Sequence, residues 1–236
     1  MNTIYFRDLG LIEYGEAWQL QESLMEKGLK LKAEWYNKPE GARPDSIGTT
    51  NHLLFCVHPH VYTLGKSGHM DNLLVNDQRL KELNVSFYKT NRGGDITYHG
   101  PGQIVGYPVL DLELFFTDLG RYMRSLEEVI IRMLAHYGIN ADRLAGATGV
   151  WLDANDPSKA RKICAMGVRC SRWITIHGFA LNVNTDLKYF DYIVPCGITD
   201  KKVTSMQKEL GQQVNEEDVK GILKKEFAEV FEAKIT

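Results

Sequence analysis

The chain has 236 residues, of which 44% are hydrophobic and 25% are charged, and its formal net charge is -2. This length and composition suffice for one sizeable globular core, and a nearly balanced charge excludes the global basic field typical of nucleic-acid binders. Arg7 and Asp8 precede any apolar run, and no later run is long enough to cross a bilayer. We therefore expect a cytoplasmic protein that acts on neither nucleic acid nor membrane.

An amphipathic helix is the first predicted element, over residues 14–34. Its apolar residues recur at helical spacing between glutamates and lysines: Ala17, Leu20, Leu24 and Leu31. Residues 37–50 follow, with prolines and glycines among polar residues. These breaker signals predict a loop insertion rather than a domain boundary.

Four β-rich stretches predict a sheet: residues 53–57, 104–110, 150–152 and 174–183. A long helix is predicted over residues 119–137, with Gly138 placed to cap it, and a last helix begins at Asn215. Strands and helices do not alternate strictly. We therefore predict an α+β fold, in which one domain over residues 1–236 has a mixed β-sheet packed with helices.

A glycine-rich stretch over residues 92–103 holds the densest group of glycines and polar side chains, including Arg92 and His99. Glycine permits positive φ and close backbone approach, so such a loop can direct amide groups at an oxygen of a bound substrate. The same glycines are typical of an ordinary hairpin, because turn formation explains most such clusters. Both interpretations remain open from the local pattern.

Lys162 enters a short stretch of small and apolar residues, 163–168. Burial disfavours the charged form of a lysine, which makes Lys162 a candidate base or a positive charge beside a nucleophile. The alternative is an edge-strand lysine whose stem carries the ammonium to solvent.

The chain has four cysteines: Cys56, Cys164, Cys170 and Cys196. They form no Cys-x-x-Cys pair and are too sparse for a disulfide scaffold or a standard zinc site. Cys196 lies between a proline and a glycine, a setting typical of a rigid turn, whereas Cys56 and Cys164 have apolar neighbours. Cys196 is therefore the candidate nucleophile, and a purely structural cysteine is the alternative.

Taken together, four segments resemble, in order and spacing, the lipoyl(octanoyl) transferase family of the biotin- and lipoate-protein ligase superfamily: residues 59–65, the Arg92 loop, Lys162-Ile163 and Pro195-Cys196-Gly197. The resemblance implies a biotin/lipoate-protein ligase-like fold. It implies transfer of an octanoyl group from octanoyl-acyl carrier protein to the lysine of lipoyl domains, in 2-oxoacid dehydrogenases and in the H protein of glycine cleavage. Neither ATP, a metal nor another cofactor is implied.

The resemblance also implies the site residues. Cys196 matches the residue that carries the acyl thioester, and Lys162 matches the lysine that promotes its ionisation. The implied substrate-binding residues are Arg92, Gly93, Gly94, Asp95, Ile96, Thr97, Tyr98, His99, Ala165, Met166, Gly167, Gly178, Phe179 and Ala180. Thr175-Ile176 and the length of residues 37–50 depart from the family, but the catalytic pair is unaffected.

Two other functions are compatible with the sequence. An ATP-dependent lipoate or biotin ligase shares the implied fold but has no use for the Cys196 thiol. A non-catalytic module that recognises carrier or lipoyl domains would bind without an acyl adduct. Because such partners are typically acidic, Lys201, Lys202 and Lys208 are predicted either as a basic docking face or as ordinary solvated lysines.

Overall fold

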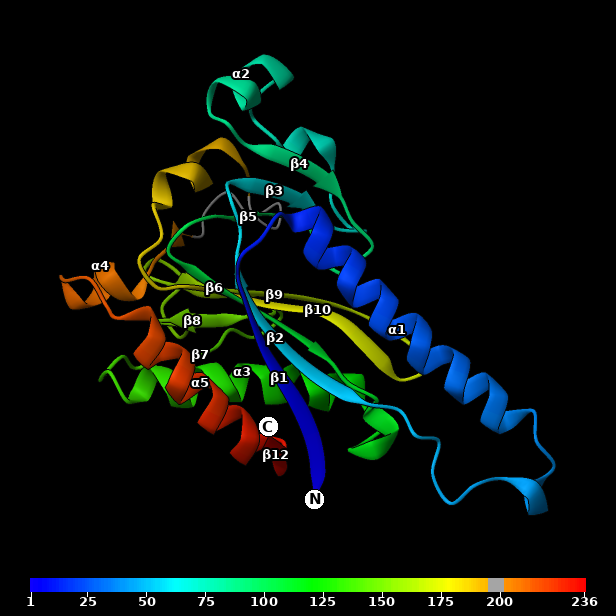
Figure 1. Cartoon of the computed structure of the whole chain (residues 1–236). Helices are drawn as coiled ribbons and strands as arrows, with labels where there is room; N and C mark the ends of the chain where they lie inside the picture. The colour runs from blue at the N-terminus through cyan, green and yellow to red at the C-terminus, as the bar shows by residue number, and fades with distance from the viewer. Residues whose placement is uncertain (195–201) are drawn as a thin grey trace.

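The computed structural model describes residues 1–194 and 202–236, and a large mixed sheet crosses its middle (Figure 1). Within the described residues this sheet has nine strands: β1 (Asn2–Leu11), β2 (Asn51–Val57), β6 (Gln103–Val109), β7 (Asp142–Arg143), β8 (Val150–Leu152), β9 (Arg161–Ser171), β10 (Ile174–Asn182), β11 (Lys202–Val203) and β12 (Ala233–Ile235). The order is β12-β1-β2-β6-β10-β9-β8-β7, and β11 pairs with β9. The β1–β12, β1–β2 and β11–β9 pairs are parallel and the other pairs antiparallel.

Helices cover both faces of the large sheet. They are α1 (Tyr14–Tyr36), α3 (Leu119–Ala135), α5 (Glu216–Val230) and the short α4 (Met206–Leu210). Successive residues of a strand face opposite ways, and β2 follows this rule. Leu53 and Phe55 lie in the core with α3 and α5, whereas Leu54 and Cys56 pack with Ala17 of α1. Figure 1 shows α3 and α5 on one side of the sheet and α1 on the other.

A smaller sheet lies on the α1 side of the large one (Figure 1). It consists of β3 (Val61–Leu64), β4 (Ser86–Lys89) and β5 (Ile96–His99), in the order β4-β3-β5. Its own apolar cluster includes Tyr62, Tyr98 and residues of the 3-10 helix η4 (Leu187–Tyr192) and of the segment after α2 (Asp77–Glu82). The two sheets therefore have separate cores with a seam between them.

The helix ends follow the predicted capping pattern. Asp118 accepts from the amide of Arg121 at the start of α3, and Asn215 accepts from the amide of Glu217 at the start of α5. Gly138, three residues after α3, has φ +70°, the left-handed conformation that suits glycine after a helix.

The predicted fold is confirmed as a mixed sheet packed with helices, and the helices at 14–34, 119–137 and after Asn215 are all present. The predicted loop at 37–50 contains only the 3-10 turn η1 (Glu40–Ala42). Strands β1, β3, β4, β5, β7, β9, β11 and β12 had no counterpart among the four predicted β-rich stretches. Among the described residues, no helix combines the length and the apolar character needed to cross a membrane.

Candidate active site

A cavity lies at the seam between the two sheets, with about 800 Å³ of space free of protein atoms, including space open to solvent. Its walls come from the Arg92 loop and β5 on one side and from β6, β9 and β10 on the other, with Tyr14 of α1 and Phe190 of η4 completing them. A concave pocket with mostly apolar walls and a few polar groups is typical of a small-ligand site.

Most of the predicted substrate-binding residues meet at this cavity. Twelve of the fourteen line it: Arg92, Gly94, Asp95, Ile96, Thr97, His99, Ala165, Met166, Gly167, Gly178, Phe179 and Ala180. The topology explains the meeting, because β9 pairs with β10 so that Gly167 lies opposite Gly178 and Ala165 opposite Ala180. The two strands thus form one wall, opposite the Arg92 loop.

Two predicted residues are absent from the lining. Tyr98 belongs to the core of the small sheet, where its hydroxyl lies 2.7 Å from Nδ1 of His60 and its ring stacks on Tyr189. Gly93 is a backbone contact instead, since its amide donates to the carbonyl of Val168 at 2.9 Å. Both residues therefore contact the residues around the cavity instead of lining it.

The glycines of the Arg92 loop serve both turn formation and close approach. Gly94 has φ +84°. A Cβ at Gly167 of β9 would lie 2.6 Å from the carbonyl oxygen of Gly93, so the loop and the strand can touch only because no side chain separates them. Arg92 is 8% exposed, and its Nη2 donates to the carbonyl and the hydroxyl of Thr63 at 2.6 and 2.9 Å. A guanidinium is thereby fixed at the cavity wall.

Lys162 lines the cavity from within the sheet and not from an edge. Its backbone has Trp151 of β8 on one side and Val203 of β11 on the other. The lysine Nζ lies 4.6 Å from the centre of the Trp151 indole, a cation–π arrangement. The edge-strand alternative for Lys162 is therefore wrong. The two-residue strand β11 pairs with β9 on the side that would otherwise be the edge of the sheet.

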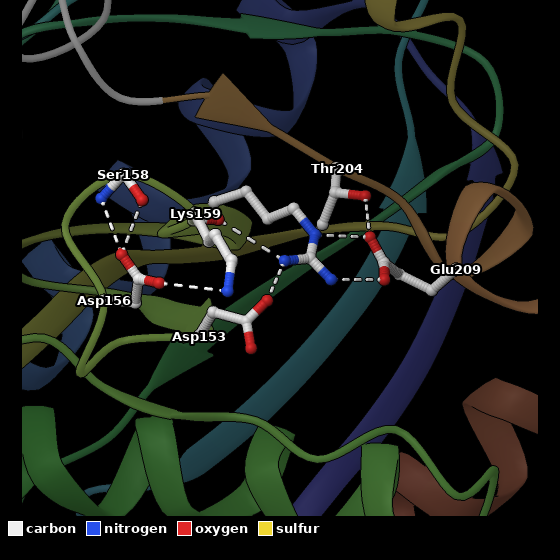
Figure 2. A network of polar contacts seen from close by, with 7 residues as sticks. Asp153, Asp156, Ser158, Lys159, Thr204 and Glu209 are labelled. Carbon is white, nitrogen blue, oxygen red and sulfur yellow. Dashed lines mark hydrogen bonds and ion pairs between the residues drawn. The ribbon is translucent and has the colours of Figure 1, made fainter.

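The chain re-enters the described structure beside Lys162. The amide of Thr204 donates to the carbonyl of Lys162 at 2.9 Å. Next to it, Arg161 donates to both carboxylate oxygens of Glu209 at 2.7 and 2.6 Å, and the Thr204 hydroxyl donates to the same carboxylate. Figure 2 shows Thr204 and Glu209 in this network. The polar network ties α4 and β11 to β9.

The other border of the undescribed segment is tied to the Arg92 loop. Val194 donates its amide to the carbonyl of Asn72 at 2.8 Å, and Asn72 donates its side-chain amide to Asp95 at 2.6 Å. Cys196, the predicted nucleophile, lies outside the described residues, as does Lys201. The other two lysines of the predicted basic face, Lys202 and Lys208, are exposed.

Several cavity residues escaped the sequence analysis, among them Tyr14, Gln103, Tyr107, Asn182 and His177. His177 had a usable signal, because it directly precedes the predicted substrate-binding residue Gly178, and Gln103 ends the glycine-rich stretch 92–103. The other three lie in segments whose patterns indicate only core positions.

The histidines around the cavity are neutral. Burial lowers the pKa of His177 to about 3 and that of His58 to about 4, and it holds the pKa of His99 well below its ordinary value. Burial raises the pKa of Tyr14 to about 12. Across residues 1–194 and 202–236, no group of three or more His, Cys, Asp or Glu side chains is arranged to hold a metal ion.

Comparison with known proteins gives concordant matches. The family model described as the lipoyl protein ligase A/B catalytic domain matches residues 13–228. An octanoyltransferase of Christiangramia forsetii is 56% identical over 97% of this chain and 96% of its own length, and one of Flavobacterium johnsoniae is 55% identical over 98% of each. A bi-partite lipoate protein ligase of Thermoplasma acidophilum has a similar fold, with a TM-score of 0.69 at 17% identity over 100% of this chain and 86% of that one.

Proposed function

The chain belongs to the lipoyl protein ligase A/B catalytic domain family, and on that premise we propose that it is an octanoyltransferase that takes its acyl group from acyl carrier protein. The main support is the similarity to two octanoyltransferases, which are 55–56% identical to this chain over nearly its whole length and nearly the whole of their own. The acceptor is the lysine of a lipoyl domain, which makes the reaction a step of protein lipoylation. Since a thiol nucleophile requires a reducing compartment, we place the reaction in the cytoplasm.

The cavity suits a medium-length acyl chain. Its apolar lining is formed by residues from both sheets and from η4: Ile96, Val105, Met166, Phe179 and Phe190. Each methylene moved from water into such a wall contributes roughly 0.8 kcal/mol, so binding grows with chain length until the cavity is full. The polar groups at Lys162 and Arg92 would then lie toward the thioester end.

Cys196 is the proposed nucleophile and Lys162 its partner. Support comes from two contacts near the ends of the described ranges: Val203 pairs with Lys162, and Val194 is tied through Asn72 to the cavity loop. An ordinary cysteine has a pKa of about 8.5, so a neighbouring ammonium would increase the thiolate fraction at neutral pH.

The proposed reaction has two balanced steps. In the first, the Cys196 thiolate attacks the octanoyl carbonyl carbon, a C–S bond forms, the carrier C–S bond breaks, and the leaving thiolate takes a proton from Lys162. In the second, the neutral amine of the acceptor lysine forms a C–N bond, the Cys196 C–S bond breaks, and the amine proton passes to Lys162. The thioester keeps the acyl group activated between the steps. Lys162 ends as it began, and the reaction needs no ATP because the donor thioester is already activated toward the amine.

Intact mass spectrometry tests this proposal. The purified chain mixed with octanoyl-acyl carrier protein should gain one octanoyl group, labile to hydroxylamine, and Cys196→Ala should gain none. Cys170→Ala is the matched control, because Cys170 is half-buried on β9 away from the cavity lining and should leave the adduct intact. An adduct that persists in Cys196→Ala would remove the cysteine from the mechanism.

The same samples separate the alternatives. Transfer that requires ATP would favour the lipoate or biotin ligase, and binding of lipoyl domains with neither adduct nor transfer would favour the non-catalytic module. The basic face is tested by Lys202→Glu with Lys208→Glu, which should slow association with acidic carrier domains more than it slows chemistry.

A further inference from the structure

His177 occupies an unusual backbone conformation at the cavity. Its φ is +60°, a left-handed value uncommon for a non-glycine residue, and it is 1% exposed. The conformation is held from α1, because the His177 amide donates to Oε1 of the buried Gln21 at 2.8 Å, and Gln21 donates to the carbonyl of Ala17. Strain of this kind persists only where the surroundings fix it, and it often marks a functional position.

A chain of hydrogen bonds determines which ring nitrogen of His177 carries the proton. Nδ2 of Asn91 donates to the Glu22 carboxylate at 2.7 Å, so it is the amide oxygen Oδ1 that lies 2.7 Å from Nε2 of His177. An amide oxygen only accepts, so Nε2 must donate. In a neutral imidazole the second nitrogen, Nδ1, then has a free lone pair.

Glu22 is itself held firmly. It accepts from the indole nitrogen of Trp18 at 3.0 Å and from Nη1 of Arg169 at 2.8 and 2.9 Å, in addition to Asn91. The carboxylate therefore cannot turn toward His177, and the amide of Asn91 cannot flip without losing a charge-assisted hydrogen bond. Hydrogen bonds from Arg169 to Glu22, from Asn91 to Glu22 and from His177 to Asn91 thus fix the orientation of the histidine ring.

Nδ1 of His177 is buried and has no hydrogen-bond partner within residues 1–194 and 202–236. A buried acceptor without a partner lowers the stability of the folded chain, and such groups in native proteins call for an explanation. His177 lines the cavity. A bound group with an N–H or O–H would supply the missing donor.

We propose that Nδ1 of His177 accepts a hydrogen bond from the amine of the incoming acceptor lysine, with Asn91 and Glu22 as positioning residues that fix the ring. The inference rests on the proposed function. Neither the octanoyl chain nor its thioester carries an N–H or O–H, whereas the lysine amine carries two hydrogens. One is held by His177, and the other is the proton that leaves during attack.

The surrounding charges favour this assignment. Arg92 lines the same cavity, and its positive charge opposes the entry of a second cation. The lysine must therefore arrive as the neutral amine, whose N–H groups need an acceptor rather than a counter-ion. A neutral imidazole nitrogen fills that role without removing the proton itself.

The test separates the two half-reactions by rapid quench and intact mass spectrometry. His177→Phe keeps the ring but removes both nitrogens. We expect octanoyl adduct formation from octanoyl-acyl carrier protein within about twofold of the unaltered chain, and decay of the adduct on adding a lipoyl domain slowed roughly tenfold or more. His177→Asn, which tolerates positive φ and restores a polar side chain of similar reach, should recover part of the decay rate.

His58→Phe is the matched control. His58 is also buried, but both of its nitrogens have partners, the carbonyl of Ile12 and the hydroxyl of Tyr107. It should lose stability without changing the ratio of the two half-reaction rates.

The inference would be overturned if decay of the adduct in His177→Phe were unchanged, or were slowed only as much as adduct formation. Slowed adduct formation alone would overturn it too, and would assign Nδ1 to the donor's pantetheine arm instead. Absence of any adduct on the unaltered chain would overturn the proposed function itself, and the inference with it.

Discussion

Trp151 and Lys162 face each other across β8 and β9, with the lysine nitrogen 4.6 Å from the centre of the indole ring. The aromatic face can stabilise the ammonium through a cation–π interaction. This arrangement suits a lysine that must give up and regain a proton during turnover.

Lys162→Arg should separate charge from proton transfer. Guanidinium keeps the positive charge but does not deprotonate in proteins, so an octanoyl adduct should still form while transfer to the acceptor lysine falls by about 100-fold or more. Rapid-quench mass spectrometry measures both. Lys162→Met, which loses the charge as well, should slow both steps, and full turnover in Lys162→Arg would rule out the relay.

His177 should remain neutral through the physiological range. Burial, and then the positive charge of Arg92, lower its pKa to about 3, so its Nδ1 resonance should show an unprotonated nitrogen from pH 5 to 8 in ¹⁵N NMR. In the unfolded chain His177 has the ordinary histidine pKa of about 6.5. Between pH 6.5 and about 3 only the unfolded chain binds a proton at His177, so the free energy of unfolding decreases as the pH falls through this range. His177→Phe should flatten that part of the stability profile. Titration near 6.5 in the folded chain would contradict the buried geometry.

The anchor beside Lys162 should weaken in acid. Hydrogen bonds from Arg161 hold the pKa of Glu209 below its ordinary value, so its contribution is present above the ordinary glutamate value of about 4.3 and is lost as the pH falls through the folded value. Hydrogen exchange at β11 and α4 should accelerate under acid relative to exchange in α3. Glu209→Gln should exchange faster at neutral pH and lose most of the pH dependence.

Gly106→Ala should destabilise the fold. A Cβ at Gly106 of β6 would lie 2.2 Å from the ring of Phe179, so the cavity wall would have to shift at a cost of about 1–3 kcal/mol. Gly221→Ala is the matched control: Gly221 lies within α5 with nothing near its Cβ position, and alanine there should stabilise by about 0.5–1 kcal/mol. Urea unfolding measures both. Equal stability in the two variants would show that Phe179 is not packed as described.

Local pattern was enough for α1, α3 and α5, for β2, β6, β8 and β10, and for the α+β class, because each has a periodicity or cap within its own residues. It was not enough for β1, which is largely exposed on both faces and so lacks a clear alternation. Its partner β12 lies at the opposite end of the chain, and Asn2 pairs with Ala233. Pairing across that separation depends on packing that no window of sequence contains.

For the site, the sequence by itself indicated most of the segments that line the cavity, because unusual residues at glycine-rich positions stand out locally. Only the tertiary structure decided that Lys162 lies between two strands, that Tyr98 turns away from the cavity, and that Asn91 and Glu22 fix the tautomer of His177. A side chain's hydrogen-bond partners and burial arise from long-range contacts. Residues of ordinary type, such as Asn91, acquire a role only when the fold brings them to the ring that they orient.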